Sequence, residues 1–417
     1  MKLEVLPSEL TGIVRVSGAK NSALKLLTAS LLTSETVVLH GFPTGLSDAR
    51  IHLEMLELLG KRIRVDGETV EIWEDSGSGV ALRWKGRSIR NTLLILGALV
   101  TRRGEGSVPS PGGCDLGDRK YDLHEYVLRS MGADVSDDGE SLHAKRRFSR
   151  LQGTDLHLSI RSTGATENAI LCAVLAKGVT RVWNPHVRPE ILDLVRMLRK
   201  MGARIAVYGQ ERIEIEGVAS LRGVEHNVIP DNMEALTWLV GAVLTGGDVE
   251  IEGFPDEHLG VPLIHLRESG ARLFANKDSV IVRGGRPLPV EIATGAYPGI
   301  NSDMQPLFGA FGALAHGTSK IVDLRFPGRY RYAEQFRNLG IDNEVRDGVL
   351  TIHGKGRDAV QGNQVQAVDL RAGVALLIVG LAASRGTTVI NDAWQIERGY
   401  DRFVEKFRSL GARISVA

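Results

Sequence analysis

The chain has 417 residues, which is more than one hydrophobic core usually supports, so we expect two domains. Hydrophobic residues make up 43% of the chain and charged residues 24%, and the formal net charge is +1. This balance is ordinary for a globular protein and argues against nucleic acid or an anionic membrane as a partner. There is no apolar run long enough to span a membrane, no signal-peptide core at the start and only two cysteines, so we expect a cytoplasmic protein.

A short glycine-centred tag recurs along the chain at nearly constant spacing. Its glycines are Gly60, Gly132, Gly202, Gly270, Gly340 and Gly411, and successive members are 68 to 72 residues apart. Such regular spacing is typical of a structural repeat. The sequence therefore predicts six similar units.

Each unit is predicted to begin with an apolar helix. In chain order these helices lie within residues 17–32, 89–100, 162–176, 230–244, 301–315 and 369–383. A strand, an amphipathic helix and two closing strands follow, so each unit has the order helix, strand, helix, strand, strand. Because the first helices are apolar on most faces, we expect them inside, with sheets around them.

The last unit ends without its final strand, and the N-terminal strand at residues 2–7 can supply it. We therefore expect an α/β protein with three units in each of two domains. The predicted first domain is 16–226, and the predicted second domain combines 1–15 with 227–417. The chain is expected to cross between them for the second time near residues 224–227.

Polar residues gather at the starts of the six apolar helices. They are Lys20 and Asn21, Arg90 and Asn91, Ser162 and Thr163, Asp231 and Asn232, Asn301 with Ser302 and Asp303, and Asp369 with Arg371. Helix starts expose unpaired N–H groups and attract anions, and N-capping accounts for the Ser, Asp and Asn members. Capping does not account for Lys20, Arg90 or Arg371, since a cation is unfavourable there. These three residues indicate a shared anionic ligand, and the alternative is a stacked repeat without a catalytic site.

Cys114 lies in a segment rich in proline and glycine, which is typical of a mobile surface loop. Neighbouring basic residues could perturb the pKa of its thiol, which makes Cys114 a candidate proton donor or nucleophile, although spacing alone does not decide this. Cys172 lies in an apolar helix and is expected to pack in the core. His124 and His186 lack partners at ligand spacing, so no metal site is predicted.

Seven segments resemble the UDP-N-acetylglucosamine enolpyruvyl transferases (1-carboxyvinyltransferases), in that family's order and over nearly the full chain. They are SGAKNSAL, PGGCDLGDR with YDLH, STGATEN, PDNMEA, SDMQP, DLRAG and ERGYDRF. The resemblance implies a two-domain inside-out α/β barrel. It also implies transfer of the enolpyruvyl group of phosphoenolpyruvate to a hydroxyl of a uridine nucleotide, with release of phosphate and no metal or organic cofactor. The related enzyme that acts on shikimate 3-phosphate shares the fold but lacks the PGGC loop.

The resemblance also implies roles for individual residues. Phosphoenolpyruvate would be bound by Lys20, Asn21, Arg90, Arg119, Arg371 and Arg398. Catalysis would use Lys20, Asp303 as the proton acceptor beside the acceptor hydroxyl, and Cys114 as the acid that protonates the methylene carbon. The uridine nucleotide would contact Arg119, Lys120, Tyr121, Asp122, Leu123, Ser162, Thr163, Gly164, Asp303, Arg325 and Arg329.

The chain departs from the family pattern near the acceptor. Where the family has a segment like REPEI, this chain has VRPE at residues 187–190, and where the family has a segment like VFENR, it has RFPGR at residues 325–329. An acidic residue is lost in each segment, the second at Pro327, and Arg188 and Arg325 are gained. One acceptor consistent with this is UDP-N-acetylglucosamine, in the synthesis of peptidoglycan precursors. Another is a uridine nucleotide such as UMP, whose terminal phosphate would suit the added arginines. A non-catalytic nucleotide-binding protein on the same scaffold is a third interpretation.

Overall fold

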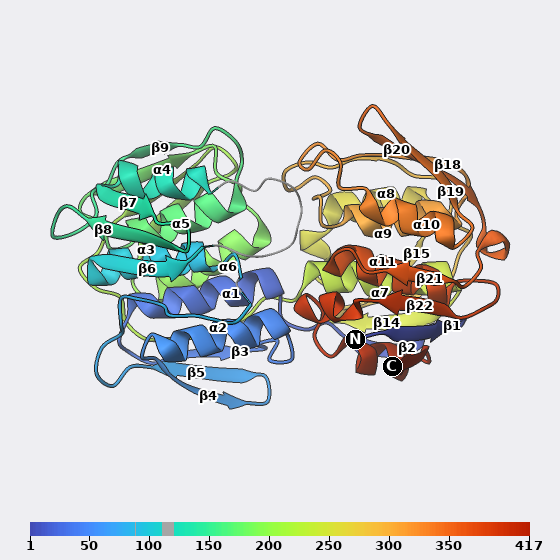
Figure 1. Ribbon diagram of the computed structural model, residues 1–417, viewed down its shortest axis with the longest axis horizontal. Helices are drawn as coiled ribbons and strands as arrows, with labels where there is room; N and C mark the ends of the chain where they lie inside the picture. The colour runs from blue at the N-terminus through green and yellow to red at the C-terminus, as the bar shows by residue number, and fades with distance from the viewer. Residues whose placement is uncertain (88, 111–120) are drawn as a thin grey trace.

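Two separate hydrophobic cores divide the chain between them. One gathers buried residues from 23 to 228, and the other gathers buried residues from 3 to 16 and from 233 to 414. The computed structural model describes residues 1–87, 89–110 and 121–417 (Figure 1). Figure 1 shows a lobe around each core, side by side, with both chain termini on the second lobe.

The first lobe contains three series of elements, each in the order helix, strand, helix, strand, strand. The first series is α1 (Lys20–Ala29), β3 (Val37–His40), α2 (Ser47–Leu58), β4 (Arg62–Asp66) and β5 (Thr69–Trp73). The second is α3 (Thr92–Arg103), β6 (Glu105–Pro109), α4 (Asp122–Ser130), β7 (Ala133–Asp137) and β8 (Ser141–Arg146), followed by β9 (Asp155–His157). The third is α5 (Thr163–Ala173), β10 (Val179–Trp183), α6 (Pro189–Lys200), β11 (Arg204–Tyr208) and β12 (Arg212–Glu216), followed by β13 (Val224–Asn227).

The second lobe contains three further series. The first is α7 (Asn232–Thr245), β14 (Asp248–Glu252), α8 (Gly260–Glu268), β15 (Arg272–Ala275) and β16 (Ser279–Arg283). The second is α9 (Gln305–Leu314), β18 (His316–Val322), α10 (Arg331–Asn338), β19 (Asp342–Arg346) and β20 (Val349–Lys355). The third is α11 (Leu370–Leu381), β22 (Thr388–Asn391), α12 (Phe403–Ser409) and β23 (Arg413–Val416). Strands β1 (Leu3–Leu6), β2 (Thr11–Arg15), β17 (Glu291–Ala293) and β21 (Gln364–Gln366) also belong to this lobe.

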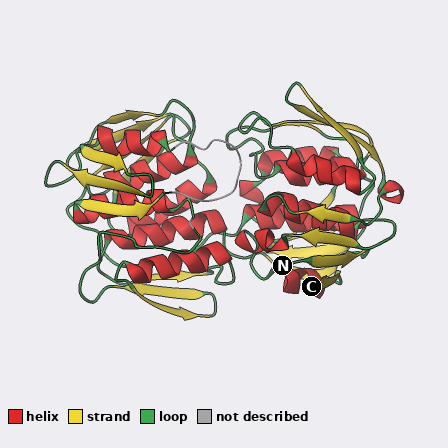
Figure 2. Ribbon diagram, in the orientation of Figure 1, coloured by secondary structure: helices red, strands yellow, loops and turns green. Residues whose placement is uncertain are grey.

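The apolar helices lie inside their lobes and the strands lie around them (Figure 2). Every residue of α7 and α11 is buried, as their nearly continuous apolar sequences require. In the described part of the chain the strands form three sheets in each lobe. None of the helices described there combines the length and the apolar composition needed to cross a membrane.

The N-terminal strand completes the last series, as the sequence predicts. Strand β1 lies between β22 and β23 and is antiparallel to both, with Leu3 paired with Ile390 on one side and Val416 on the other. Leu3 and Val5 are fully buried in the second core. The chain start is therefore a central strand of the second lobe.

The chain exchanges strands between the two lobes. Strand β2 precedes α1 but pairs in parallel with β14 of the second lobe, and β13 precedes α7 but pairs in parallel with β3 of the first lobe. The two crossing segments hydrogen bond to each other: Ala19 N donates to Ile229 O at 2.7 Å, and Asp231 N donates to Ser17 O at 2.8 Å. At Gly18 a side chain would lie 2.0 Å from a backbone carbonyl oxygen, so only glycine fits. This junction places the starts of α1 and α7 next to each other.

Candidate active site

A cavity of about 880 Å³ lies between the two lobes. Residues at or next to the starts of α1, α3, α4 and α5 line it from the first lobe, and residues at the starts of α9 and α11 line it from the second. The start of α7 does not line the cavity. There the Asp231 carboxylate accepts hydrogen bonds from the backbone N–H groups of Met233, Glu234 and Lys20. Five of the six polar helix starts identified in the sequence thus face one cavity.

Most of the predicted site residues that the structure describes line this cavity. They are Lys20, Asn21, Arg90, Asp122, Leu123, Ser162, Thr163, Gly164, Arg188, Asp303, Arg325, Pro327, Arg329, Arg371 and Arg398. Tyr121 is not among the residues that line the cavity, and its hydroxyl donates a hydrogen bond to the Asp137 carboxylate on β7. Cys114, Arg119 and Lys120 lie outside the described residues.

One buried carboxylate holds two of the predicted cations in place. Asp48 Oδ2 lies 2.8 Å from Lys20 Nζ, and its Oδ1 lies 3.3 Å from Arg398 Nε and 2.7 Å from a guanidinium nitrogen of Arg87. Burial alone would raise the pKa of Asp48, but Lys20 and Arg398 outweigh it and lower the pKa below its usual value. The sequence did not reveal this role, since an acidic residue in the first turn of α2 is an ordinary helix feature.

The Arg371 side chain is almost completely buried at the start of α11. Its exposed fraction is 1%, and its guanidinium lies 5.0 Å from the centre of the Tyr400 ring. Among the described residues, neither Nε nor Nη1 of Arg371 has a hydrogen-bond partner. A buried cation with unsatisfied donors is costly, and an anion in the cavity would remove that cost.

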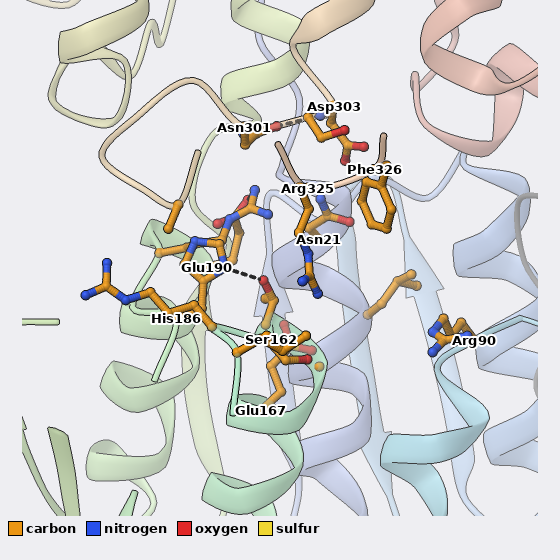
Figure 3. Close-up of a pocket in the computed structure, with 18 of the residues that line it drawn as sticks. Asn21, Arg90, Ser162, Glu167, His186, Glu190, Asn301, Asp303, Arg325 and Phe326 are labelled. Carbon is orange, nitrogen blue, oxygen red and sulfur yellow. Dashed lines mark hydrogen bonds and ion pairs between the residues drawn. The ribbon is translucent and has the colours of Figure 1, made fainter. Parts of the chain in front are cut away.

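Asp303 lies on the opposite lobe from Asn21, just before α9 (Figure 3). Its Oδ1 accepts a hydrogen bond from Arg329 at 2.8 Å, and its carboxylate is 31% exposed. Burial would raise the pKa of Asp303, but Arg329 and Arg371 hold it well below its usual range. Asp303 is therefore ionised at neutral pH and is available as a proton acceptor at the cavity wall.

Glu167, one turn into α5, is a second carboxyl group in the cavity wall. Its Oε2 lies 3.7 Å from Lys25 Nζ, whereas its Oε1 has no hydrogen-bond partner among the described residues. Burial raises the pKa of Glu167 to about 7, against the opposing effect of Lys25. Sequence reasoning used this residue only as part of the STGATEN segment and assigned it no role.

His186 connects the two lobes across the cavity. Its Nε2 accepts a hydrogen bond from the backbone N–H of Tyr297 at 3.0 Å, so its Nδ1 carries the hydrogen and donates to Thr163 Oγ1 at 2.9 Å. Burial, together with the nearby charges of Arg188 and Arg325, lowers the pKa of His186 to about 3. His186 is therefore a neutral bridging residue.

Comparisons with known proteins decide the family. The family model described as EPSP synthase (3-phosphoshikimate 1-carboxyvinyltransferase) matches residues 6–407. The chain is 40% identical to UDP-N-acetylglucosamine 1-carboxyvinyltransferase 1 of Carboxydothermus hydrogenoformans, over 97% of this chain and 95% of that protein. The chain belongs to the enolpyruvyl transferase family.

Other enolpyruvyl transferases match over the same full length. The UDP-N-acetylglucosamine 1-carboxyvinyltransferase of Methylacidiphilum infernorum is 38% identical over 97% of this chain and 96% of its own. The crystal structure of the enolpyruvyl transferase NikO from Streptomyces tendae covers 99% of this chain and 98% of its own, with a TM-score of 0.89 and 26% identity. EPSP synthase from Acinetobacter baumannii, at 20% identity and a TM-score of 0.77 over the whole of both chains, shows the shared fold. The resemblance found in the sequence is thus confirmed.

The raised pKa of Glu167 predicts a pH dependence of stability. This carboxyl titrates near 4.5 in an ordinary environment and at about 7 in the folded protein, so between these values the folded state binds more protons than the unfolded state. Its contribution to stability is present below the lower value and is lost as the pH rises through the upper one. Over this interval Glu167→Gln should lose less stability than the wild type, by on the order of 3 kcal/mol. Urea unfolding of both proteins at the two ends measures this, and parallel pH profiles would contradict it.

Proposed function

We propose that this enolpyruvyl transferase moves the enolpyruvyl group of phosphoenolpyruvate onto a hydroxyl of UDP-N-acetylglucosamine and releases phosphate. The observation that carries the proposal is the joint placement of cations at several helix starts and an ionised carboxylate, Asp303, in one cavity between the lobes. The relatives named as UDP-N-acetylglucosamine 1-carboxyvinyltransferases support this acceptor.

Phosphoenolpyruvate carries a phosphate and a carboxylate, and both need cationic partners. We assign these to Lys20, Arg90, Arg371 and Arg398, with Asn21 beside them; Arg119 is assigned with them by resemblance and lies outside the described residues. Lys20 and Arg398 are held by Asp48 before any ligand arrives, so less side-chain order is lost on binding. Binding of the anion would give hydrogen-bond partners to Arg371, whose buried Nε and Nη1 donors have none among the described residues.

The reaction needs one proton donor and one proton acceptor. Protonation of the methylene carbon of phosphoenolpyruvate makes its central carbon electrophilic, and the acceptor oxygen attacks that carbon to give a tetrahedral phosphate adduct. Asp303 takes the proton of the acceptor hydroxyl. Loss of phosphate, together with loss of one proton from the methyl carbon, then gives the enol ether. Cys114 is the proposed acid, by resemblance, and lies outside the described residues.

We further propose that the lobes are two inside-out α/β barrel domains, residues 16–226 and residues 1–15 with 227–417, which close over the substrates. Closure would exclude water and strengthen the contacts of the cations with the developing charge. His186 hydrogen bonds to Tyr297 of the other lobe, so the lobes are already in contact on this side of the cavity.

The second candidate acceptor is a uridine nucleotide with a terminal phosphate, such as UMP. The observation that favours it is that Arg325, like Arg188, lines the same cavity as Asp303. Arg325 is exposed, and its guanidinium lies 5.5 Å from the Phe326 ring, so it is accessible to a ligand. Arg188 supports this candidate less, because Glu190 accepts a hydrogen bond from it at 3.0 Å.

The direct test is phosphate release from phosphoenolpyruvate with each acceptor in turn. We expect release with UDP-N-acetylglucosamine and none above background with UMP. Release with UMP alone would replace the first acceptor by the second. Release with neither nucleotide would remove the proposed reaction and leave the nucleotide-binding interpretation.

Replacing Asp303 by asparagine tests the proton acceptor. The variant keeps the shape of the side chain, and Arg329 retains Asp369 as a partner at 3.4 Å, so the fold should be maintained. We expect kcat to fall by about 10²- to 10⁴-fold, because an amide cannot take the hydroxyl proton. Asp342→Asn, on an exposed position of β19, is the control. A kcat close to that of the control would show that Asp303 is not the base.

A further inference from the structure

An arginine of the first lobe contacts a tryptophan ring of the second lobe, next to the cations around Asp48. The guanidinium of Arg87, between β5 and α3, lies 5.2 Å from the centre of the Trp394 ring. Trp394 belongs to the short 3₁₀ helix η4 (Ala393–Arg398), which also carries Arg398. Both side chains of this contact are half-buried. The chemistry proposed above gives neither of them a role.

Arg87 also takes part in the charge cluster around Asp48. Its Nη2 donates to Asp48 Oδ1 at 2.7 Å and to Ser47 Oγ at 3.3 Å. The same Oδ1 lies 3.3 Å from Arg398 Nε, and Oδ2 lies 2.8 Å from Lys20 Nζ. Three cations therefore share one carboxylate. Burial raises the pKa of this carboxyl, and the three cations together lower it below its usual value.

Arg87 influences a bound anion only through Asp48. Lys20, Asp48 and Arg398 line the cavity, whereas Arg87 is not among the described residues that do so. Because Arg87 shares the negative charge of Asp48, more of the positive charge of Lys20 and Arg398 is left for the anion. Without Arg87, the same carboxylate would be compensated by those two cations alone and would repel a phosphate beside it more strongly.

The segments that carry Arg87 and Arg398 are fixed relative to each other. Trp84 Nε1 donates to the backbone carbonyl oxygen of Arg87 at 2.9 Å, which holds the chain on the first lobe. On the second lobe, Gln395 Oε1 accepts a hydrogen bond from Arg398 Nη1 at 3.1 Å. Trp394 precedes Gln395 in the chain, so its contact with Arg87 joins these two local arrangements. Partial burial strengthens such a cation–π contact.

We propose that Arg87 is a positioning residue for phosphoenolpyruvate binding, which compensates the charge of Asp48 and is itself held in place by Trp394 of the other lobe. Arg87 does not touch the substrate. The inference rests on the proposed function, because it explains how the cations assigned to phosphoenolpyruvate remain available to it. With the lobes apart, Arg87 would lose the Trp394 ring and Asp48 would lose Arg398, so the cation cluster is complete only when the lobes are together.

The test measures the KM of each substrate in phosphate release. Arg87→Gln should raise the KM for phosphoenolpyruvate by about tenfold, because one charge-assisted hydrogen bond to Asp48 is lost. Trp394→Leu should raise it by about threefold, because only the ring contact is lost. The double variant should resemble Arg87→Gln, since Trp394 acts through Arg87. The KM for the acceptor should stay within about twofold of the wild type in all three variants.

Two variants are matched controls. Arg283→Gln removes an arginine that lies 5.5 Å from the Phe274 ring on another sheet, and its side chain is 59% exposed. Glu68→Gln removes a different ion pair between the lobes, in which Arg402 lies 2.9 Å from Glu68. Both controls should keep the wild-type KM for phosphoenolpyruvate, and a thermal melt of every variant checks its fold.

Three results would overturn the proposal. A wild-type KM for phosphoenolpyruvate in Arg87→Gln would show that Arg87 does not act on the cation cluster. An equal rise of both KM values would show that Arg87 supports the cavity as a whole. Effects of the two single variants that multiply in the double variant would show that Trp394 does not act through Arg87.

Failure of the proposed function is seen separately. The rise in Tm caused by phosphoenolpyruvate is measured in parallel and should be smaller in Arg87→Gln than in the wild type. If the wild type releases no phosphate with any acceptor, the proposed function is wrong, and this rise in Tm still tests the role of Arg87.

Discussion

The structure depends on cations held at the starts of buried helices. The helix dipole opposes a cation at that position, and burial adds a desolvation cost. Asp48 offsets part of this cost for Lys20, and it also pairs with the buried Arg398; Asp303 pairs with the buried Arg329. Arg371 lies over the Tyr400 ring, and its Nε and Nη1 have no hydrogen-bond partner among the described residues. Such an arrangement is stable only with a large apolar core beneath it, and it is useful only if an anion binds.

The fold provides both the apolar core and the cavity in which an anion can bind. Six apolar helices pack inside two lobes, and the strands around them complete the sheets. The exchange of β2 and β13 brings the chain twice through one junction, which joins the start of α1 to the start of α7. The other helix starts then face each other across one cavity. Of the cations that we assign to phosphoenolpyruvate, Lys20 and Arg90 come from the first lobe, and Arg371 and Arg398 come from the second, which also carries Asp303. Approach of the lobes would therefore assemble the proposed reacting groups.

Sequence reasoning predicts local features well and long-range partners poorly. The apolar periodicity and the spaced glycines indicate the element order, and the truncated last unit indicates that β1 joins β22 and β23, because these signals lie within single segments. The family segments place Lys20, Asp303 and Arg371 in the site. Asp48 and Glu167 escape notice, since their partners come from other elements and neither residue type is unusual at its position. Tyr121 was expected at the acceptor, but its hydroxyl bonds to Asp137, a contact that the motif does not encode.

We infer that the buried positive charge is maintained for an anionic substrate and not for stability. Thermal unfolding of Arg371→Met, with and without phosphoenolpyruvate, tests this most directly. Because methionine fills similar apolar space without unsatisfied donors, we expect the variant without ligand to melt at or above the wild-type temperature. We also expect the rise in Tm caused by phosphoenolpyruvate to be lost. A variant that melts at a lower temperature and keeps that rise would show that Arg371 is structural and does not serve an anionic substrate.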